Sequence, residues 1–225
     1  MRENVLTQVA KSGVLRVAIN TGNRALVQQN DGQLTGVSPA LAQRLADEIG
    51  LPLEAVVYSG AGRVFADALN NLWDVAFLAV DAARAEKVSF TSPYLTIEAT
   101  YAVRASSDLN NISDVDQAGV SVLTASGSAY DMYLTETLQR AQLERHGTPF
   151  ESFEAFKSGR CDAVAGVRAS LEAKFSDDPA IRVLPGALTS VHQAMVLPGP
   201  DNPHILALNS FVERAISDGF IADHL

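Results

Sequence analysis

Two series of short apolar runs, separated by helix-type patterns, place the strongest constraint on how this chain folds. The first series predicts strands at 15–19, 53–58 and 75–80 and helices at 38–49 and 63–70. The second predicts strands at 120–123, 142–146 and 162–167 and helices at 129–140, 150–157 and 169–175. Such alternation produces parallel sheets with right-handed crossovers. We therefore expect an α/β protein of two similar lobes, each with its own mostly parallel sheet flanked by helices.

The remaining segments predict how the two lobes connect. Residues 96–104 and 191–197 have strand-type composition, and 203–217 follows as a helix too short to form a domain of its own. If this tail returns to the first lobe, the chain crosses between the lobes twice, and two crossings form a hinge over a ligand-binding cleft. The predicted boundaries are lobe 1 at 1–103 plus 190–225, lobe 2 at 104–189, and a hinge near 102–105 and 188–193.

Local signals predict particular turns and helix starts. Asn30-Asp31-Gly32 is typical of a hairpin turn. Ser38 followed by Pro39 is typical of a helix start, with Ser38 as the N-cap and Pro39 in the first turn.

Charge and composition exclude several classes of partner. The chain has 225 residues, 17 Lys and Arg against 26 Asp and Glu, a formal charge of −9 and a pI of about 4.8. Nucleic acids and anionic membranes require a clustered positive surface, so neither is expected as the main partner. The single cysteine, Cys161, predicts a small core residue, and the four histidines lack metal-ligand spacing. We expect no metal and no cofactor.

The sequence offers no clear targeting signal. Its first 13 residues lack the apolar centre of a secretory signal, and no segment approaches the roughly 18 apolar residues of a membrane span. Either the protein is then intracellular, or a targeting segment has been removed from it.

A charged pair follows the third predicted strand, where open α/β sheets bind ligands at the carboxyl ends of their strands. Asp81 and Arg84 lie three residues apart in the segment from Asp74 to Tyr94. From position alone, they form either part of a ligand site or a solvent-exposed ion pair. Further polar candidates lie in the loop after the first strand, which contains Gly22 and Asn23.

The same segment resembles the signature of the family 3 extracellular solute-binding proteins, which serve ABC importers, mostly for polar amino acids. The matching residues are Asp74-Val75-Ala76, Arg84-Ala85-Glu86-Lys87-Val88 and Phe90-Thr91-Ser92-Pro93-Tyr94. The order of the predicted elements is similar to that family along essentially the whole chain. The resemblance implies a two-lobed type II periplasmic-binding-protein fold, with the ligand in the cleft between the lobes.

The resemblance assigns a carboxylate-binding role to Arg84. A guanidinium matches a carboxylate bidentately and stays charged at any relevant pH. The small-residue turn of the second lobe, Ser126-Gly127-Ser128, precedes a helix whose free N–H groups favour the same anion. Aromatic residues sandwich the ligand in this family, and Tyr58, Phe77 and Tyr130 are the candidates, although each is equally consistent with core packing.

The chain departs from the family where the ligand's amine binds. The helix start Gly36-Val37-Ser38-Pro39-Ala40 lacks the two acids of the family pattern. The amine-binding Asp of the family falls on Val167, with Arg168 beside it. The hydroxyl positions near the carboxylate-binding Arg fall on Ala79 and Asp81.

Two hypotheses follow from this departure. In the first, which we favour, Asp81, with or without Glu98, binds an ammonium, and the ligand is an amino acid or another amine-bearing compound. In the second, Arg168 also faces the cleft and the ligand carries two anionic groups.

The sequence therefore predicts a monomeric binding protein of the periplasm or cell exterior. It closes on a small carboxylate-bearing ligand, an amino acid or a derivative. It then delivers this ligand to the membrane permease of an ABC importer. One alternative is a dehydratase of the arogenate or prephenate type, which resembles this family and needs an acid in the cleft. Its candidate acids are Glu98, Asp131 and Glu172. Another alternative is a ligand-sensing domain of a receptor.

Overall fold

The computed structural model describes residues 5–10 and 12–225. In its first half, strand β1 (Leu15–Asn20) lies between β4 (Leu53–Tyr58) and β5 (Val75–Ala79), and both pairings are parallel. In its second half, β8 (Ser121–Thr124) lies between β9 (Gln142–Arg145) and β10 (Ala163–Val167), again in parallel. Each half thus repeats one strand order, with the second strand first, then the first, then the third.

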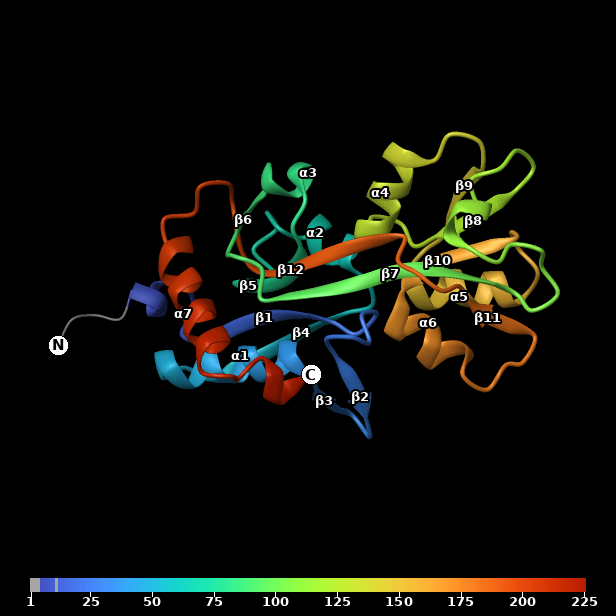
Figure 1. Ribbon diagram of the computed structural model, residues 1–225. Coiled ribbons are helices and arrows are strands. Elements are labelled where there is room, and N and C mark those ends of the chain that lie inside the picture. The colour runs from blue at the N-terminus through green and yellow to red at the C-terminus, as the bar shows by residue number, and fades with distance from the viewer. Residues whose placement is uncertain (1–4, 11) are drawn as a thin grey trace.

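Two long antiparallel strands join the halves. Strand β7 (Leu95–Arg104) pairs with β12 (Thr189–Pro198) through its first half and with β10 and β11 (Ile181–Val183) through its second. Strand β12 continues beside β5 and β6 (Val88–Phe90). Figure 1 shows β7 and β12 running side by side between the two halves. The expectation of a separate sheet for each lobe is therefore wrong, because these pairings connect the described strands into one ten-stranded sheet.

The helices cover both faces of this sheet. They are α1 (Val37–Ile49), α2 (Ala61–Ala66), α3 (Ala82–Ala85), α4 (Ala129–Thr137), α5 (Pro149–Lys157), α6 (Arg168–Phe175) and α7 (Ile205–Ser217). Short 3₁₀ segments lie at Val5–Val9, Ile112–Asp114 and Ala222–His224, and β2 (Gln28–Asn30) and β3 (Gln33–Thr35) form a separate hairpin. Among the described residues, no helix is long and apolar enough to cross a membrane.

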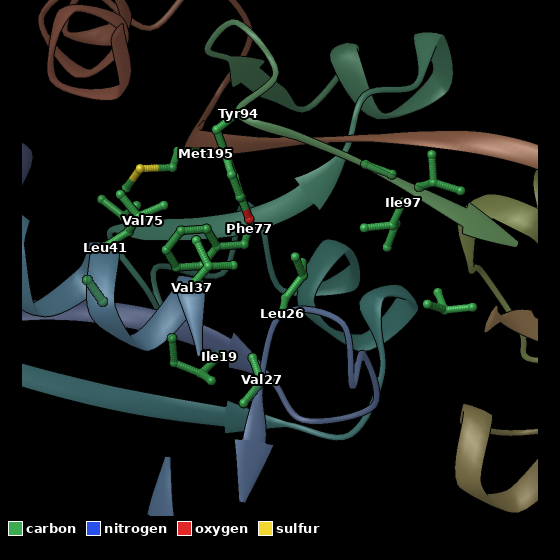
Figure 2. Packing of buried hydrophobic residues seen from close by; sticks show 14 of the residues in the cluster. Ile19, Leu26, Val27, Val37, Leu41, Val75, Phe77, Tyr94, Ile97 and Met195 are labelled. Atoms are coloured by element: carbon green, nitrogen blue, oxygen red, sulfur yellow. The ribbon is translucent and has the colours of Figure 1, made fainter. Parts of the chain in front are cut away.

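Side-chain alternation along the buried strands divides the core by face. In β5, Val75, Phe77 and Ala79 join the large cluster, whereas Ala76 and Leu78 face the cluster that contains Val64 of α2. Figure 2 shows part of the large cluster, with Phe77 close to Tyr94, Val37 and Leu26. Phe77 and Tyr94 meet edge to face, with ring centroids 6.1 Å apart.

Some local predictions are confirmed. The β2–β3 hairpin turns at Asp31 and Gly32, which have φ of 48° and 83°, as the Asn-Asp-Gly signal predicted. The helix predicted at 150–157 is α5. Its capping box was not predicted: Thr148 and Glu151 each accept a hydrogen bond from the other's backbone N–H.

Other local predictions are wrong. Helix α1 begins at Val37, not after a Ser38 cap, because Gly36 is the N-cap and Ser38 N–H donates to Leu26 O. Helix α4 ends at Thr137 instead of continuing to residue 140, because the backbone N–H groups of 139–141 donate to Asp116. Helix α3 and strand β11 were not predicted, since each is too short to show a period.

Candidate ligand-binding site

A cavity of about 50 Å³ lies between the two halves, at the carboxyl ends of their parallel strands. Much of its wall comes from the ends of β1, β5, β8 and β10 and the segments that follow them. Eight of the residues predicted from the sequence line the cavity: Asn23, Phe77, Ala79, Arg84, Ser126, Ser128, Tyr130 and Val167. Most of the remaining wall is apolar.

Arg84 lies on the short helix α3, which begins directly after β5. Asp81 caps this helix, because its Oδ1 accepts the Arg84 N–H at 3.1 Å. The Arg84 side chain turns back toward the strand end, where Nη1 donates to Ala79 O at 3.1 Å. Nη2 donates across the cavity to Gly127 O of the other half at 2.8 Å. The short helix thus points the guanidinium into the space between the halves.

Arg84 is a buried cation with spare hydrogen-bonding capacity. Its side chain is 1% exposed, and Nε has no hydrogen-bond partner among the described residues. Burial lowers the pKa of Arg84 to about 10, and the charge of Asp81 acts in the opposite direction. Arg84 therefore stays protonated at neutral pH, and an acid that enters the cavity meets a charged donor.

The start of helix α4 forms the facing wall. Gly127 has φ of 70°, a conformation that favours glycine, and its N–H donates to Asp131 Oδ2 at 2.9 Å. Ser128 is the N-cap and accepts the Asp131 N–H at 3.1 Å. The predicted triplet thus lies at a helix N-terminus beside Arg84: Ser126 and Ser128 line the cavity, and Gly127 supplies its carbonyl.

Asparagines after β1 form a third wall. Asn20 Oδ1 accepts the Gly22 N–H at 3.0 Å, and Asn23 Oδ1 accepts the Ala25 N–H at 3.2 Å. These bonds hold the loop in tight turns. Ser170 of α6 reaches the same loop from the other half, where its hydroxyl accepts the Arg24 N–H at 3.0 Å.

The aromatic candidates separate into two groups. Phe77 and Tyr130 line the cavity, and both also pack in the large core cluster. Burial raises the pKa of the Tyr130 phenol, so that it stays neutral. Tyr58 lies on the other face of the sheet beside α2, where its hydroxyl donates to Asp67 at 3.1 Å.

The remaining three predicted residues do not line the cavity. Asp81 borders a shallow outer hollow, and Glu98 and Arg168 pair with each other at 2.9 Å. Arg168 also donates to the carbonyls of Leu184 and Gly186, so its side chain holds a turn in the second half. These placements give no support to an ammonium at Asp81 or Glu98, or to a second anionic group at Arg168.

Sequence reasoning did not place several cavity residues. They include Asn20, Ser38, Gly60, Pro149 and Ser170. Asn20 is the last residue of the parallel strand β1, and Ser170 lies just beyond another, so the rule that selected Arg84 could have selected both. Ser38 and Pro149 reach the cavity only through the packing of helices, which no local signal reveals. Gln193 of β12 also lines the cavity.

Comparison with known proteins identifies the family. The model of the bacterial extracellular solute-binding proteins, family 3, matches residues 15–223. The chain belongs to this family. The L-cystine-binding protein TcyJ of Escherichia coli K12 is 24% identical over 224 residues, which cover 96% of this chain and 83% of TcyJ.

Solved structures share the fold of this solute-binding protein. A solute receptor for L-cysteine from Neisseria gonorrhoeae superimposes with a TM-score of 0.85 at 20% identity, covering 97% of this chain and 91% of the receptor. An ancestral amino-acid-binding protein, described as a precursor of cyclohexadienyl dehydratase, has a TM-score of 0.79 at 22% identity, covering 98% and 96%. The two-lobed α/β fold predicted from the sequence is confirmed.

The acids considered for a dehydratase are engaged elsewhere in this family 3 protein. Asp131 accepts the Gly127 N–H and pairs with Arg145 at 2.9 Å. Glu98 pairs with Arg168, and Glu172 lies 3.7 Å from the same guanidinium. Among the described residues that line the cavity, none is an acid. The carboxyl group that the dehydratase alternative expects in the cleft is thus not among the described residues of the wall.

Proposed function

We propose that this solute-binding protein captures a small carboxylate-bearing solute, an amino acid or a derivative of one, in the cavity between its halves. Arg84 holds the carboxylate, and the α4 N-terminus at Ser128 faces the same group. The observation that carries this proposal is the buried Arg84 guanidinium, whose Nε lacks a partner among the described residues and whose nearest wall is a helix N-terminus. The names of relatives that bind cystine and cysteine support a solute of this size.

The bound solute is delivered to the membrane permease of an ABC importer, and the protein acts as a monomer in the periplasm or outside the cell. Membership of an extracellular solute-binding family supports this role. Binding, not catalysis, is the proposed activity, because no acid lines the cavity among the described residues.

Hinge closure is the proposed mechanism. The first half with the tail forms one lobe and the middle of the chain the other, joined at β7 and β12. Ala99 is the last β7 residue opposite β12 and also pairs with β10, and it lies opposite Thr189. Residues 102–104 pair with β10 and β11. We therefore propose residue 99 as the first hinge position, ahead of the range expected from the sequence, and residue 189 as the second.

Replacement of Arg84 by methionine tests the proposed site. Methionine fills a similar volume without charge, so affinity for the bound solute should fall by about 100-fold, as expected when a buried charged partner is lost. The melting temperature of the free protein should stay equal or rise, because a buried charge is removed. The measurement is isothermal titration calorimetry with thermal unfolding of the free protein.

Arg24→Met is the matched control, since it removes the same charge from an exposed side chain that does not line the cavity. It should leave affinity unchanged. Equal affinity of Arg84→Met and the unaltered protein would contradict the proposed site.

A further inference from the structure

Among its described residues, the wall of the cavity carries one positive charge and no negative charge. Arg84 is the one charged residue among the described residues of the wall, and the other lining residues are neutral. A ligand that carries both a carboxylate and an ammonium would place a second cation in this wall with no carboxylate in contact. Burial of an unpaired charge costs several kcal/mol.

The two asparagines of the wall also present hydrogen-bond donors to a ligand. A backbone N–H can only donate, so the bonds from Gly22 N and Ala25 N fix the amide oxygens of Asn20 and Asn23 as their acceptors. Each asparagine then keeps its whole NH₂ group for a ligand, and that group donates and cannot accept from an ammonium. The amide oxygen, which already accepts a backbone N–H, keeps one uncharged lone pair.

Some oxygens of the wall already accept one hydrogen bond each. Ser128 Oγ accepts the Asp131 N–H, and Ser170 Oγ accepts the Arg24 N–H while it donates to Gly22 O at 3.3 Å. The carbonyls of Ala79 and Gly127 accept from Arg84. All the acceptors of the wall are neutral oxygens, the Ser126 and Tyr130 hydroxyls and the Gln193 amide among them, so none carries the negative charge that would balance an ammonium.

Asp81 does not supply a negative charge within the cavity. It borders a different hollow, with Val80, Met132 and His192, and its Oδ1 accepts the Arg84 N–H. Its charge favours protonated Arg84 from outside the cavity. An ammonium beside Arg84 would therefore lie next to the Arg84 cation of the wall, whereas the Asp81 carboxylate lies outside the cavity.

We propose that the ligand is a small monoanionic acid with a neutral oxygen at C2, a 2-oxo or 2-hydroxy acid, and that the site selects it over the corresponding α-amino acid. This inference rests on the proposed function, because it requires the carboxylate to lie at Arg84. The carboxylate accepts from the guanidinium, and the C2 oxygen accepts from the asparagine amides. The mostly apolar wall of Phe77, Leu26 and Val191 contacts a short aliphatic body.

Matched ligand series test the proposal. Each series keeps one side chain and changes only C2, for example pyruvate, lactate and alanine, or 2-oxoisovalerate, 2-hydroxyisovalerate and valine. Titration calorimetry on the full chain should give the oxo or hydroxy acid an affinity at least about 10-fold above that of the amino acid, a difference expected when a site's buried polar groups match only one of two analogues.

The outcomes separate the two proposals. Tighter binding of the amino acids would overturn this inference and leave the proposed function intact. Absence of binding by any amino, oxo or hydroxy monocarboxylic acid would overturn both.

A single substitution supplies the converse test. Asn23→Asp keeps the oxygen that accepts the Ala25 N–H, so the loop is retained, and it places an acid in the wall. The preference for the oxo or hydroxy acid over the amino acid should shrink by about 10-fold or reverse. Gln117→Glu, at an exposed position in the other half, adds the same charge and should leave the preference unchanged. An unchanged preference in Asn23→Asp, with its folding verified by circular dichroism, would contradict the proposal.

Discussion

Arg84 is a cation balanced by backbone oxygens instead of by a contacting carboxylate. Two carbonyls accept from its Nη atoms, and one of them, Gly127 O, belongs to the other half of the molecule. Carbonyl dipoles compensate a buried charge only in part, which is why burial lowers the pKa of this side chain. A ligand carboxylate would supply the missing charge, so ligand binding should stabilise this residue more than any other in the wall.

The affinity for a carboxylate ligand should be nearly independent of pH between about 5.5 and 8.5. Arg84, with a pKa of about 10, is protonated throughout this range, and no histidine lines the cavity among the described residues. Above about pH 10 the free protein loses the charge on Arg84, so affinity should fall there. Calorimetric titrations at several pH values measure this, with circular dichroism as the control for folding. A change above threefold between pH 6 and 8 would contradict Arg84 as the charged group.

The sequence indicates Arg84 because its position after a buried strand is a local property, and the surrounding motif identifies it as the carboxylate ligand. Asp81 shows the limit of such reasoning. Its position was correct, but its side chain turns to cap α3, and Arg168 likewise turns to the Leu184 and Gly186 carbonyls. Rotamers depend on tertiary neighbours, so the direction of each polar side chain was not predictable.

Among the elements, helix α2 approaches the other half closely. Gly62 of α2 faces the turn at Ser126 and Gly127, and a Cβ on Gly62 would lie 2.5 Å from Ser126 O. The backbone segments approach this closely only because both Gly62 and Gly127 lack side chains. Helix α2 therefore acts as the surface against which the α4 turn closes.

Gly62→Ala should weaken ligand binding without weakening the fold. The three atoms nearest to the added methyl group belong to the other half, so the methyl group opposes closure, while alanine is favoured over glycine within a helix by about 1 kcal/mol. We expect an affinity loss of about 10-fold or more and a free-protein melting temperature that is equal or higher. Calorimetry and thermal unfolding measure the two quantities.

Ala66→Ser is the matched control, since it adds one heavy atom to an exposed residue of the same helix that does not line the cavity. Its affinity should change little. Equal affinities for Gly62→Ala and Ala66→Ser would show that the Gly62 contact does not limit closure.

Most elements were predictable because apolar period and turn residues are encoded locally, as in the runs that became β1, β5 and β10. The ends of elements were less predictable. The end of α4 depends on Asp116, which lies in a different loop and accepts three backbone N–H groups beyond the helix. Such a long-range partner leaves no mark in the sequence of the helix that it ends.

At the scale of the whole molecule, local sequence patterns did not reveal that strands of both halves form one continuous sheet. Both halves have the expected order of strands, but the pairing of β7 with β12 joins them into one sheet. Two adjacent strands form a narrow connection between the larger halves (Figure 1). Small changes of twist in these strands would rotate one half against the other, as hinge motions do.

Polar contacts outside this connection also join the two halves. Arg84 reaches Gly127 O at 2.8 Å, Ser170 accepts the Arg24 N–H at 3.0 Å, and Arg63 lies 3.8 Å from Glu151. The neutral bond and the exposed ion pair each contribute on the order of 1 kcal/mol or less, and the charged bond of Arg84 about 2 kcal/mol. A ligand that contacts both halves is then expected to shift the population toward the closed form.

Small-angle X-ray scattering tests this expectation directly. The radius of gyration should decrease when the tightest-binding acid of the matched series is added at saturation, because the ligand joins Arg84 to the α4 turn. In Gly62→Ala, the same ligand at saturation should produce a smaller decrease, since the added methyl group keeps the halves apart. The free and bound proteins should both scatter as monomers. An identical radius of gyration with and without ligand, despite binding in calorimetry, would show that the cavity fills without any hinge motion.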